Sequence, residues 1–352
     1  MNLFLFLLLL VMGIGVQAQT ITTDNFGSGS DIFSIDFVEI GNPGNAADTS
    51  GNPNPAGAVA YTYHLGKYEI SREVIAKANA GGGLGITLAD LSTYGGNAVE
   101  RPATGISWNE AAKFVNWLNT STGRSAAYKF DANGQVQFWT AGEAGFDAAN
   151  PTRNALAKYV LPTAHEWYKG AYGSPSGAWY NYSLGSDSVP TSVANGSTGV
   201  VYNRGTLTGP AAVTDAGGLS PFGTMAQGGN AREWTESIFN ATGSTTMNRE
   251  ERGGSWYNFS SSITVTGRNS FDPGREGFDG GFRVAFVPEP ASSSLLLVAG
   301  VTILMVGRKR RASRGEFRLR PSSRRILELR KENQSVTAGW LGKASTDCIG
   351  SF

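Results

Sequence analysis

Side chains that bind metals through sulfur or nitrogen are few and far apart in this sequence. Its 352 residues include one cysteine, Cys348, and two histidines, His64 and His165. A single cysteine excludes an intrachain disulfide, a cysteine-based metal cluster and a cysteine-pair redox site. Two isolated histidines also argue against multi-histidine zinc and iron sites. Carboxylate, amide and carbonyl oxygens on loops remain, and these favour a hard cation such as calcium.

Two short stretches that combine aromatic residues with asparagine offer a second kind of chemistry. They are Trp179–Tyr182 (WYNY) and Trp256–Asn258 (WYN). Aromatic faces stack against sugars or peptides in binding sites, which makes both stretches candidate ligand-binding loops. The alternative interpretation is that these residues belong to the core or to turns.

The charge of the chain is divided unevenly along its length. After Val306 there are 12 basic and 4 acidic residues, which leaves 17 basic and 24 acidic residues before that point. The body is therefore acidic, which argues against nucleic acid as a partner. Only 16% of the residues are charged, whereas glycine occurs 47 times. This composition indicates a turn-rich globular protein with a polar, uncharged surface.

The N-terminus has the pattern of an export signal. An apolar run from Leu3 to Val16 precedes Gln17-Ala18-Gln19, which predicts a signal peptide over 1–18, cleaved after Ala18. No lysine or arginine precedes the apolar run, so a retained membrane anchor is the alternative. Either interpretation moves the body of the protein across a membrane.

A second targeting signal is predicted near the other end. Val287-Pro288-Glu289-Pro290 is followed by an apolar stretch, 291–307, and by the basic cluster Arg308–Arg311. The apolar stretch predicts a short transmembrane segment with the basic cluster on the cytoplasmic side. An ordinary C-terminal anchor is the alternative to the sorting signal described next.

The order of these elements over 287–311 resembles a PEP-CTERM sorting signal. The resemblance implies exosortase-type sorting machinery as a partner, in a Gram-negative bacterium. It also implies that the protein is at first anchored in the membrane. It would then be cleaved near Pro288–Pro290 and delivered to the cell surface or extracellular matrix. Residues 312–352 are predicted to form a basic, disordered tail.

Within the body, alternation and helix-capping residues predict a small number of regular elements. The predicted strands are Phe33–Ile40 and Tyr61–Ile70. The predicted helices are Arg72–Ala78 after a Ser71 cap, 102–119 with Ser107 or Asn109 as a cap, and 163–172. Beyond Gly173 we expect only short strands and long loops.

Six short motifs follow one another in a characteristic order. They are Gly66–Ser71 (GKYEIS), 102–119 with SWNEA and WLN, Leu161–Trp167 (LPTAHEW), 222–234 with GNAREW, Arg252–Trp256 (RGGSW) and Gly281–Arg283 (GFR). This order is similar to that of the formylglycine-generating enzyme, or sulfatase-modifying factor, family over 33–286. The resemblance implies an α+β fold: an irregular, loop-rich single domain of the C-type-lectin-like kind.

The motif residues themselves suggest scaffolding more than chemistry. Arg283 and Glu233 are expected to pair with buried polar groups or with each other. Large aromatic side chains can anchor loops that form few backbone ladders. The expected anchors are Trp108, Trp117, Trp167, Trp234 and Trp256.

The resemblance places the family's catalytic residues on the stretch after Ser255. Catalytic members bind copper there with two cysteines and oxidise a substrate cysteine to formylglycine. Here Asn258 stands at the first cysteine position and, approximately, Ile263 at the second. Neither can supply the thiolate that stabilises Cu(I), so no copper is expected. The iron-dependent branches of the superfamily are disfavoured because His64 and His165 do not form their histidine-rich motif.

The resemblance also implies two structural calcium sites. The first would use the side chains of Asn203 and Asp215 with the backbone oxygens of Arg204 and Gly217. The second would use the Glu233 carboxylate with the carbonyls of Gly229 and Ala231. Ala226 stands where the family usually has Asp or Asn, so the second site lacks one ligand.

Together these features predict an exported, surface- or matrix-sorted protein that is not an enzyme. It would bind a polysaccharide or protein ligand or serve in the structure of the envelope or matrix. The alternative hypothesis is a divergent formylglycine-generating oxidase, or another modifying factor, that acts on exported sulfatases.

Overall fold

The computed structural model describes residues 19–239 and 247–288. The predicted signal peptide and basic tail, together with nearly all of the predicted sorting signal, lie outside these residues. Within the described ranges, no helix has the length and apolar character needed to cross a membrane.

The first sheet joins the two ends of the described chain. Its strands, in spatial order, are β1 (Ile21–Phe26), β2 (Phe33–Ile40), β3 (Tyr63–Gly66), β11 (Ala285–Phe286) and β6 (Tyr159–Val160). All neighbouring strands are antiparallel. Because β11 lies between β3 and β6, the last strand of the described chain is held from both sides.

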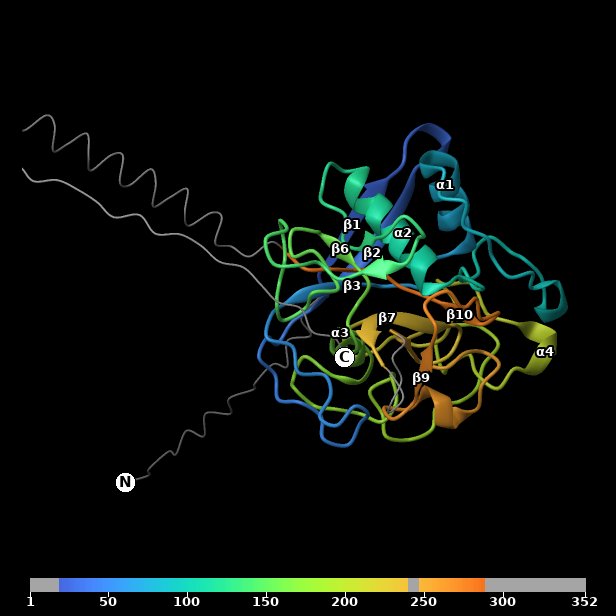
Figure 1. The fold of residues 1–352 in the computed structure, drawn as a ribbon. Helices are drawn as coiled ribbons and strands as arrows, with labels where there is room; N and C mark the ends of the chain where they lie inside the picture. Colours follow the sequence, from blue (N-terminus) through green and yellow to red (C-terminus); the bar gives the residue numbers. More distant parts are fainter. Residues whose placement is uncertain (1–18, 240–246, 289–352) are drawn as a thin grey trace, which may run out of the picture. The chain divides into compact units, whose positions relative to one another are not determined.

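Two helices lie in the same half of the molecule as this sheet (Figure 1). Helix α1 (Arg72–Gly82) begins where Ser71 Oγ accepts a hydrogen bond from the Val74 amide. Helix α2 (Trp108–Thr120) begins with a capping box formed by Ser107 and Glu110. Such caps satisfy backbone amides that the first helical turn leaves free. Local sequence therefore determines where both helices begin.

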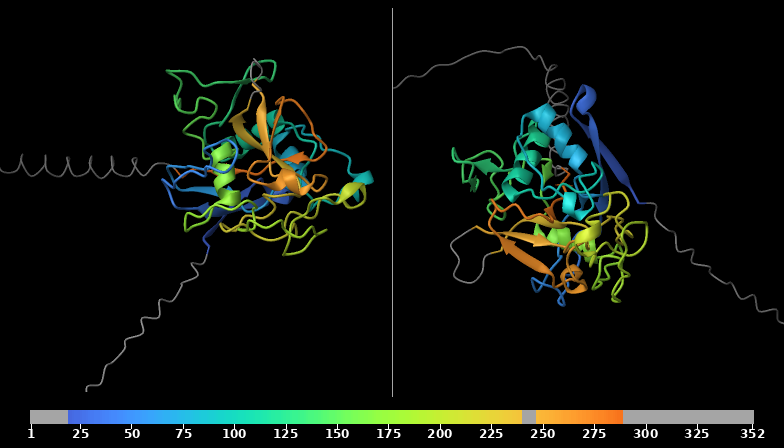
Figure 2. Two further views of the ribbon diagram at one scale, coloured as in Figure 1. Left: turned by 90° about the horizontal axis from the view of Figure 1, so that it is seen from below. Right: turned by 90° about the vertical axis from the view of Figure 1, so that its right-hand side faces the viewer.

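The other half contains a four-stranded sheet and a third helix, a separation also visible in the right-hand view of Figure 2. The strand order is β10 (Gly280–Gly281), β7 (Arg232–Ile238), β8 (Arg249–Arg252) and β9 (Arg268–Phe271), with only β10 and β7 parallel. Helix α3 (Ala164–Tyr172) packs against β7. The remaining elements are short: α4 (Gly205–Thr208), the hairpin β4 (Lys129–Phe130) and β5 (Val136–Gln137), and the 3₁₀ turns η1 (Gly29–Asp31), η2 (Ser92–Tyr94) and η3 (Ser260–Ile263).

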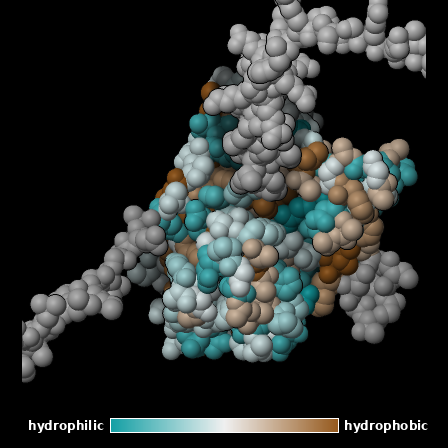
Figure 3. All heavy atoms as spheres, turned by 90° about the vertical axis from the view of Figure 1, so that its left-hand side faces the viewer, coloured by the Kyte–Doolittle hydropathy of each residue, from teal (hydrophilic) through white to brown (hydrophobic). Residues whose placement is uncertain are grey.

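Buried tryptophans connect the two halves. Trp108 Nε1 on α2 donates to Thr235 O on β7, and Trp234 Nε1 on β7 donates to Ile106 O before α2, both at 2.9 Å. Four of the five expected anchors are fully buried, and Trp117 is partly buried. On the face drawn in Figure 3, strongly hydrophobic residues form small patches between hydrophilic ones. The apolar anchors therefore stabilise a fold with long loops, as expected.

The α+β, loop-rich class is confirmed, and the strand Phe33–Ile40 has the predicted limits. The prediction for Tyr61–Ile70 was too long, because the chain leaves β2 after Lys67. Helix α2 starts six residues later than predicted, because Pro102 forms an isolated bridge with Ser71. The four-residue helix α4 after Gly173 was not expected.

Candidate functional site

A buried ion pair lies at the centre of the motif residues. Arg283 donates from Nε to Glu233 Oε2 and from Nη2 to Glu233 Oε1, both at 2.6 Å. Trp167 Nε1 donates to the same Oε2 at 2.7 Å. Arg283 also donates to the backbone oxygens of Gly66 and Met225. This confirms that Arg283 and Glu233 are each other's partners, and it gives both a structural role.

A second buried carboxylate, Glu69, was not singled out by the sequence analysis. Its Oε1 accepts from the Ala231 amide at 2.8 Å, and its Oε2 accepts from Asn230 Nδ2 at 2.5 Å. Burial, and then the nearby Glu233, raise the pKa of Glu69 to about 8. The sequence did contain a signal for this contact, because Glu69 and its two partners lie in two of the six motifs, Gly66–Ser71 and 222–234. Glu69 thus holds the Asn230–Ala231 turn in place.

The loop that resembles the family's catalytic segment is closed by Asn258. The side-chain oxygen of Asn258 accepts from the backbone amide of Ser255 at 3.0 Å and lies 3.1 Å from Ser255 Oγ. The backbone oxygen of Asn258 accepts from the Asn203 amide at 2.8 Å. An asparagine that bonds to a backbone amide in this way stabilises a turn. The residue that the resemblance places at the first cysteine position therefore shapes the loop.

Ile263, which the resemblance places approximately at the second cysteine position, belongs to the core. Ile263 is 1% exposed and packs in a cluster with Tyr182, Val200 and Tyr202. The hydrocarbon side chain of Ile263 cannot coordinate a metal. The side-chain oxygen of Asn258 is a hard donor, and it already accepts a hydrogen bond from the Ser255 amide. The donor set of this loop does not fit Cu(I), which prefers soft thiolates.

Three partly exposed rings surround this loop, and we call Tyr94, Tyr257 and Phe278 the aromatic platform. Tyr94 stacks on Phe278 with ring centres 5.2 Å apart and planes 15° apart. Tyr257 meets Phe278 edge to face at 5.6 Å. Tyr257 is 44% exposed and Phe278 36%, whereas Trp256 beneath them is fully buried. The Trp256–Asn258 stretch thus contributes one exposed ring to a rigid apolar surface.

A buried network of charged groups lies next to the platform. Ser255 Oγ donates to Asp279 Oδ2 at 2.6 Å, and Arg232 donates to Asp279 Oδ1. Glu251 Oε2 lies 3.6 Å from Arg232 Nη1 and 3.7 Å from Arg275 Nη1. Neither Glu251 oxygen accepts a hydrogen bond from the described residues, and burial raises the pKa of Glu251 to about 7. The loop is thereby tied to β7 and β8 by polar contacts.

The other aromatic stretch has a different environment. Trp179 packs on Tyr168 with ring centres 5.6 Å apart, and Tyr182 is only 8% exposed. The Tyr182 amide donates to Ser186 O in a turn. For Trp179–Tyr182, the core-and-turn interpretation therefore holds.

The residues of the first predicted calcium site lie on neighbouring segments. A bridge between Val200 and Gly217 brings these segments together, and both Asn203 and Asp215 are exposed. Arg204 follows Asn203, and its amide donates to Trp256 O. Calcium at this site stays a prediction.

The second predicted set lacks an available carboxylate. Both Glu233 oxygens accept hydrogen bonds from Arg283 or Trp167, while Gly229 and Ala231 lie in the turn held by Glu69. Within the described ranges, no three His, Cys, Asp or Glu side chains are grouped so that they could hold a metal.

Comparison with known proteins gives one family match and several similar structures. A family model described as "Sulfatase-modifying factor enzyme 1-like domain" matches residues 89–287, which include the Ser255–Ile263 loop and the platform. Treponema denticola variable protein 1 has 18% identity and a TM-score of 0.48, over 76% of this chain and 99% of that chain. PvdO from Pseudomonas aeruginosa has 19% identity and a TM-score of 0.47, over 75% and 97%. No curated protein matches the chain.

Proposed function

Because the chain belongs to the sulfatase-modifying factor enzyme 1-like family, we propose that it keeps the family scaffold for binding and not for catalysis. In this proposal the protein is exported, sorted to the cell surface or matrix through its C-terminal signal, and binds polysaccharide on the aromatic platform. Calcium at the Asn203–Asp215 site would have a structural role.

The observation that carries the proposal is the composition of the Ser255–Ile263 loop. Asn258 closes the loop through Ser255, and Ile263 is buried in the core. The residues that the resemblance places at the first thiolate position and near the second therefore have structural contacts. The adjacent Tyr257 is exposed. The same loop that lacks thiolate side chains thus presents an exposed aromatic ring.

The rings of a polysaccharide can stack on the aromatic faces of the platform. The rings of the platform are held by Trp256 and by one another, so a sugar ring can stack on them without ordering flexible side chains. Matrix delivery, as predicted from 287–311, would expose the protein to abundant polysaccharide.

The test is affinity electrophoresis of the full chain in gels that contain dextran, hydroxyethylcellulose or alginate. We expect at least one polymer to retard the wild type. The double variant Tyr257→Ala with Phe278→Ala should weaken that affinity about tenfold, because two stacking contacts are lost. Phe138→Ala is the matched control, since Phe138 is 38% exposed and lies outside the platform.

Equal migration of the wild type and the double variant in every polymer would overturn polysaccharide binding at the platform. If Phe138→Ala also abolishes the retardation, general hydrophobicity explains the effect. This result would also contradict polysaccharide binding at the platform.

A further inference from the structure

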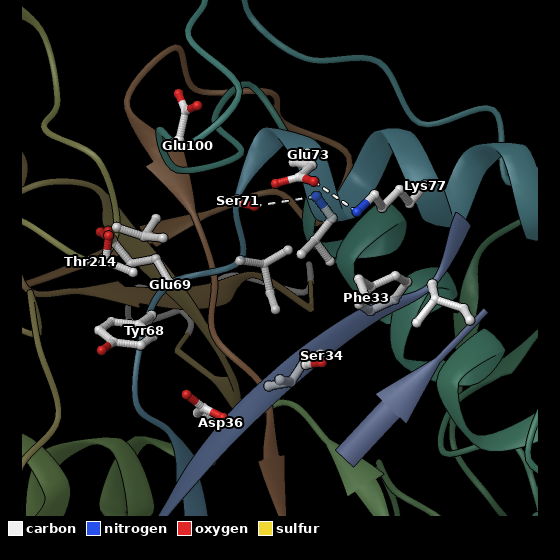
Figure 4. A pocket seen from close by; sticks show the side chains of 15 residues that line it. Phe33, Ser34, Asp36, Tyr68, Glu69, Ser71, Glu73, Lys77, Glu100 and Thr214 are labelled. Carbon is white, nitrogen blue, oxygen red and sulfur yellow. Dashed lines mark hydrogen bonds and ion pairs between the residues drawn. The ribbon is translucent and has the colours of Figure 1, made fainter. Parts of the chain in front are cut away.

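A cleft of about 470 Å³ lies in a different part of the molecule, beside the first half of β2. Residues 32–36 form one wall, 68–71 form the opposite wall, and the first half of α1 adds a third (Figure 4). Glu100 and residues 213–214 close the remaining side. The cleft includes no residue of the aromatic platform.

The cleft exposes one side of the backbone of β2. On that side, strand β3 pairs with Phe37–Ile40 only, and the last contact is the Lys67 amide donating to Asp36 O at 2.8 Å. Backbone groups alternate between the two sides of a strand, so Ser34 directs its N–H and C=O to the same side as Asp36. In the described part of the chain, no strand pairs with Ser34 on this side.

The side chains around the cleft are apolar at its base and mainly acidic at its rim. Ile70 and Val213 are buried beside it, and Ile32 is half exposed. Asp36 and Glu100 lie on opposite sides of the opening (Figure 4).

The charges at this rim are only partly neutralised. Among the lining residues, Lys77 is the one basic side chain, and it is paired with Glu73 at 2.7 Å. The Asp36 carboxylate accepts a 2.6 Å hydrogen bond from Thr23 Oγ1. Glu69 also lines the cleft, but it binds Asn230 and Ala231. Among the lining residues, no basic side chain is therefore paired with Asp36 or Glu100.

We propose that this cleft binds an extended peptide segment of a partner protein that carries a lysine or arginine side chain. The segment adds to the free side of β2 through hydrogen bonds with Ser34, as in strand addition to an open sheet edge. Its basic side chain lies between Asp36 and Glu100, while neighbouring apolar side chains cover Ile32 and Ile70. The open strand edge provides the backbone contacts, and the rim charge selects the side chain.

The probe is a fluorescent pool of capped pentapeptides with a central lysine and four randomised flanking positions. Binding to the purified full chain is followed by anisotropy. A pool with central glutamate tests charge, and a lysine pool with N-methylated backbone amides tests strand addition. We expect the glutamate and N-methylated pools to bind at least about tenfold more weakly.

The variant Asp36→Asn with Glu100→Gln keeps the size of both side chains and should weaken binding of the lysine pool about tenfold. The matched control, Glu39→Gln with Asp147→Asn, removes the same charge outside the cleft and should bind like the wild type. Hydrogen exchange gives a second measurement, in which the lysine pool should slow exchange of the Ser34 amide.

Three results with the peptide pools would overturn the proposal. They are equal binding of the lysine and glutamate pools, equal binding of the N-methylated pool, or no binding of the lysine pool at millimolar concentration. Binding that the control variant loses as well would also overturn it, because general charge attraction would then explain the affinity.

Discussion

The Glu233–Arg283 pair and the Ser255–Ile263 loop both include residues of the six motifs, but they differ in the side chains that they present. At the ion pair, every carboxylate oxygen has a partner, and both side chains are fully buried. In the loop, an amide and a buried isoleucine stand at, or in the second case near, the positions where the resemblance places the cysteines of catalytic members. If the proposed function holds, the residues that build this fold are separable from those that perform the family's chemistry.

The largest effect should come from breaking the ion pair. Arg283→Met would leave the buried Glu233 carboxylate without its cation, and we expect the free energy of unfolding to fall by about 3–5 kcal/mol. Denaturant unfolding followed by tryptophan fluorescence measures this change. Lys77→Met breaks the exposed pair with Glu73 and should cost no more than about 0.5 kcal/mol. If the free energy of unfolding falls by similar amounts in both variants, the Glu233–Arg283 pair contributes no more to stability than an exposed pair, which contradicts its structural role.

The network next to the loop should make stability depend on pH. Burial raises the pKa of Glu251 to about 7, although Arg232 and Arg275 lower it and Asp279 raises it further. Between about pH 4.5 and pH 7 the unfolded state ionises at this residue while the folded state keeps its proton. Stability should therefore fall as pH rises through this window, by up to about 3 kcal/mol.

Glu251→Gln should remove that part of the pH dependence, because glutamine does not titrate. Unfolding curves of the wild type and the variant between pH 4 and pH 8 give the comparison. Parallel pH profiles for the two proteins would contradict a protonated Glu251.

Within the loop, Asn258→Ala should cost about 1–2 kcal/mol, because it removes the acceptor of the Ser255 amide. The same denaturation experiment measures the loss. Asn181→Ala is the control, because Asn181 is exposed in the other aromatic stretch and should change stability by less than about 0.5 kcal/mol. No difference between the variants would show that Asn258 does not shape the loop.

The smallest effect concerns Ala226, which the resemblance places at a position where the family usually has Asp or Asn. Ala226 has a φ of 63°, a left-handed conformation that side chains with a Cβ disfavour. Ala226→Gly should raise the melting temperature slightly, by the equivalent of about 0.5 kcal/mol. A lower melting temperature would mean that the packing of the Ala226 methyl group outweighs the strain.

Sequence patterns predicted the local structure of this chain better than its site. The Ser71 cap of α1 was predicted, as was Ser107 as one of two candidate caps for α2, because both side chains act within one turn of their own helices. The aromatic platform was only partly predicted, because Tyr94 and Phe278 come from segments far from Tyr257 in the sequence. Only the folded chain brings these rings together.

The same limit explains the role of Glu69. Its motif, Gly66–Ser71, was noted, but its partners Asn230 and Ala231 come from a distant part of the chain. The Glu233–Arg283 pairing was among the predictions because both residues lie in motifs. Their full set of contacts, including Trp167 and the backbone oxygen of Gly66, depends on the packing of the two sheets.

The central claim is that the Ser255–Ile263 loop no longer performs the family's oxidation. It is tested most directly by incubating the purified full chain with a sulfatase-motif cysteine peptide, Cu(I), oxygen and calcium, and following the peptide by mass spectrometry beside an active family member. We predict an unchanged peptide with this chain and conversion with the active enzyme. Conversion of the cysteine to formylglycine by this chain would contradict the claim and would require a mechanism without thiolate ligands.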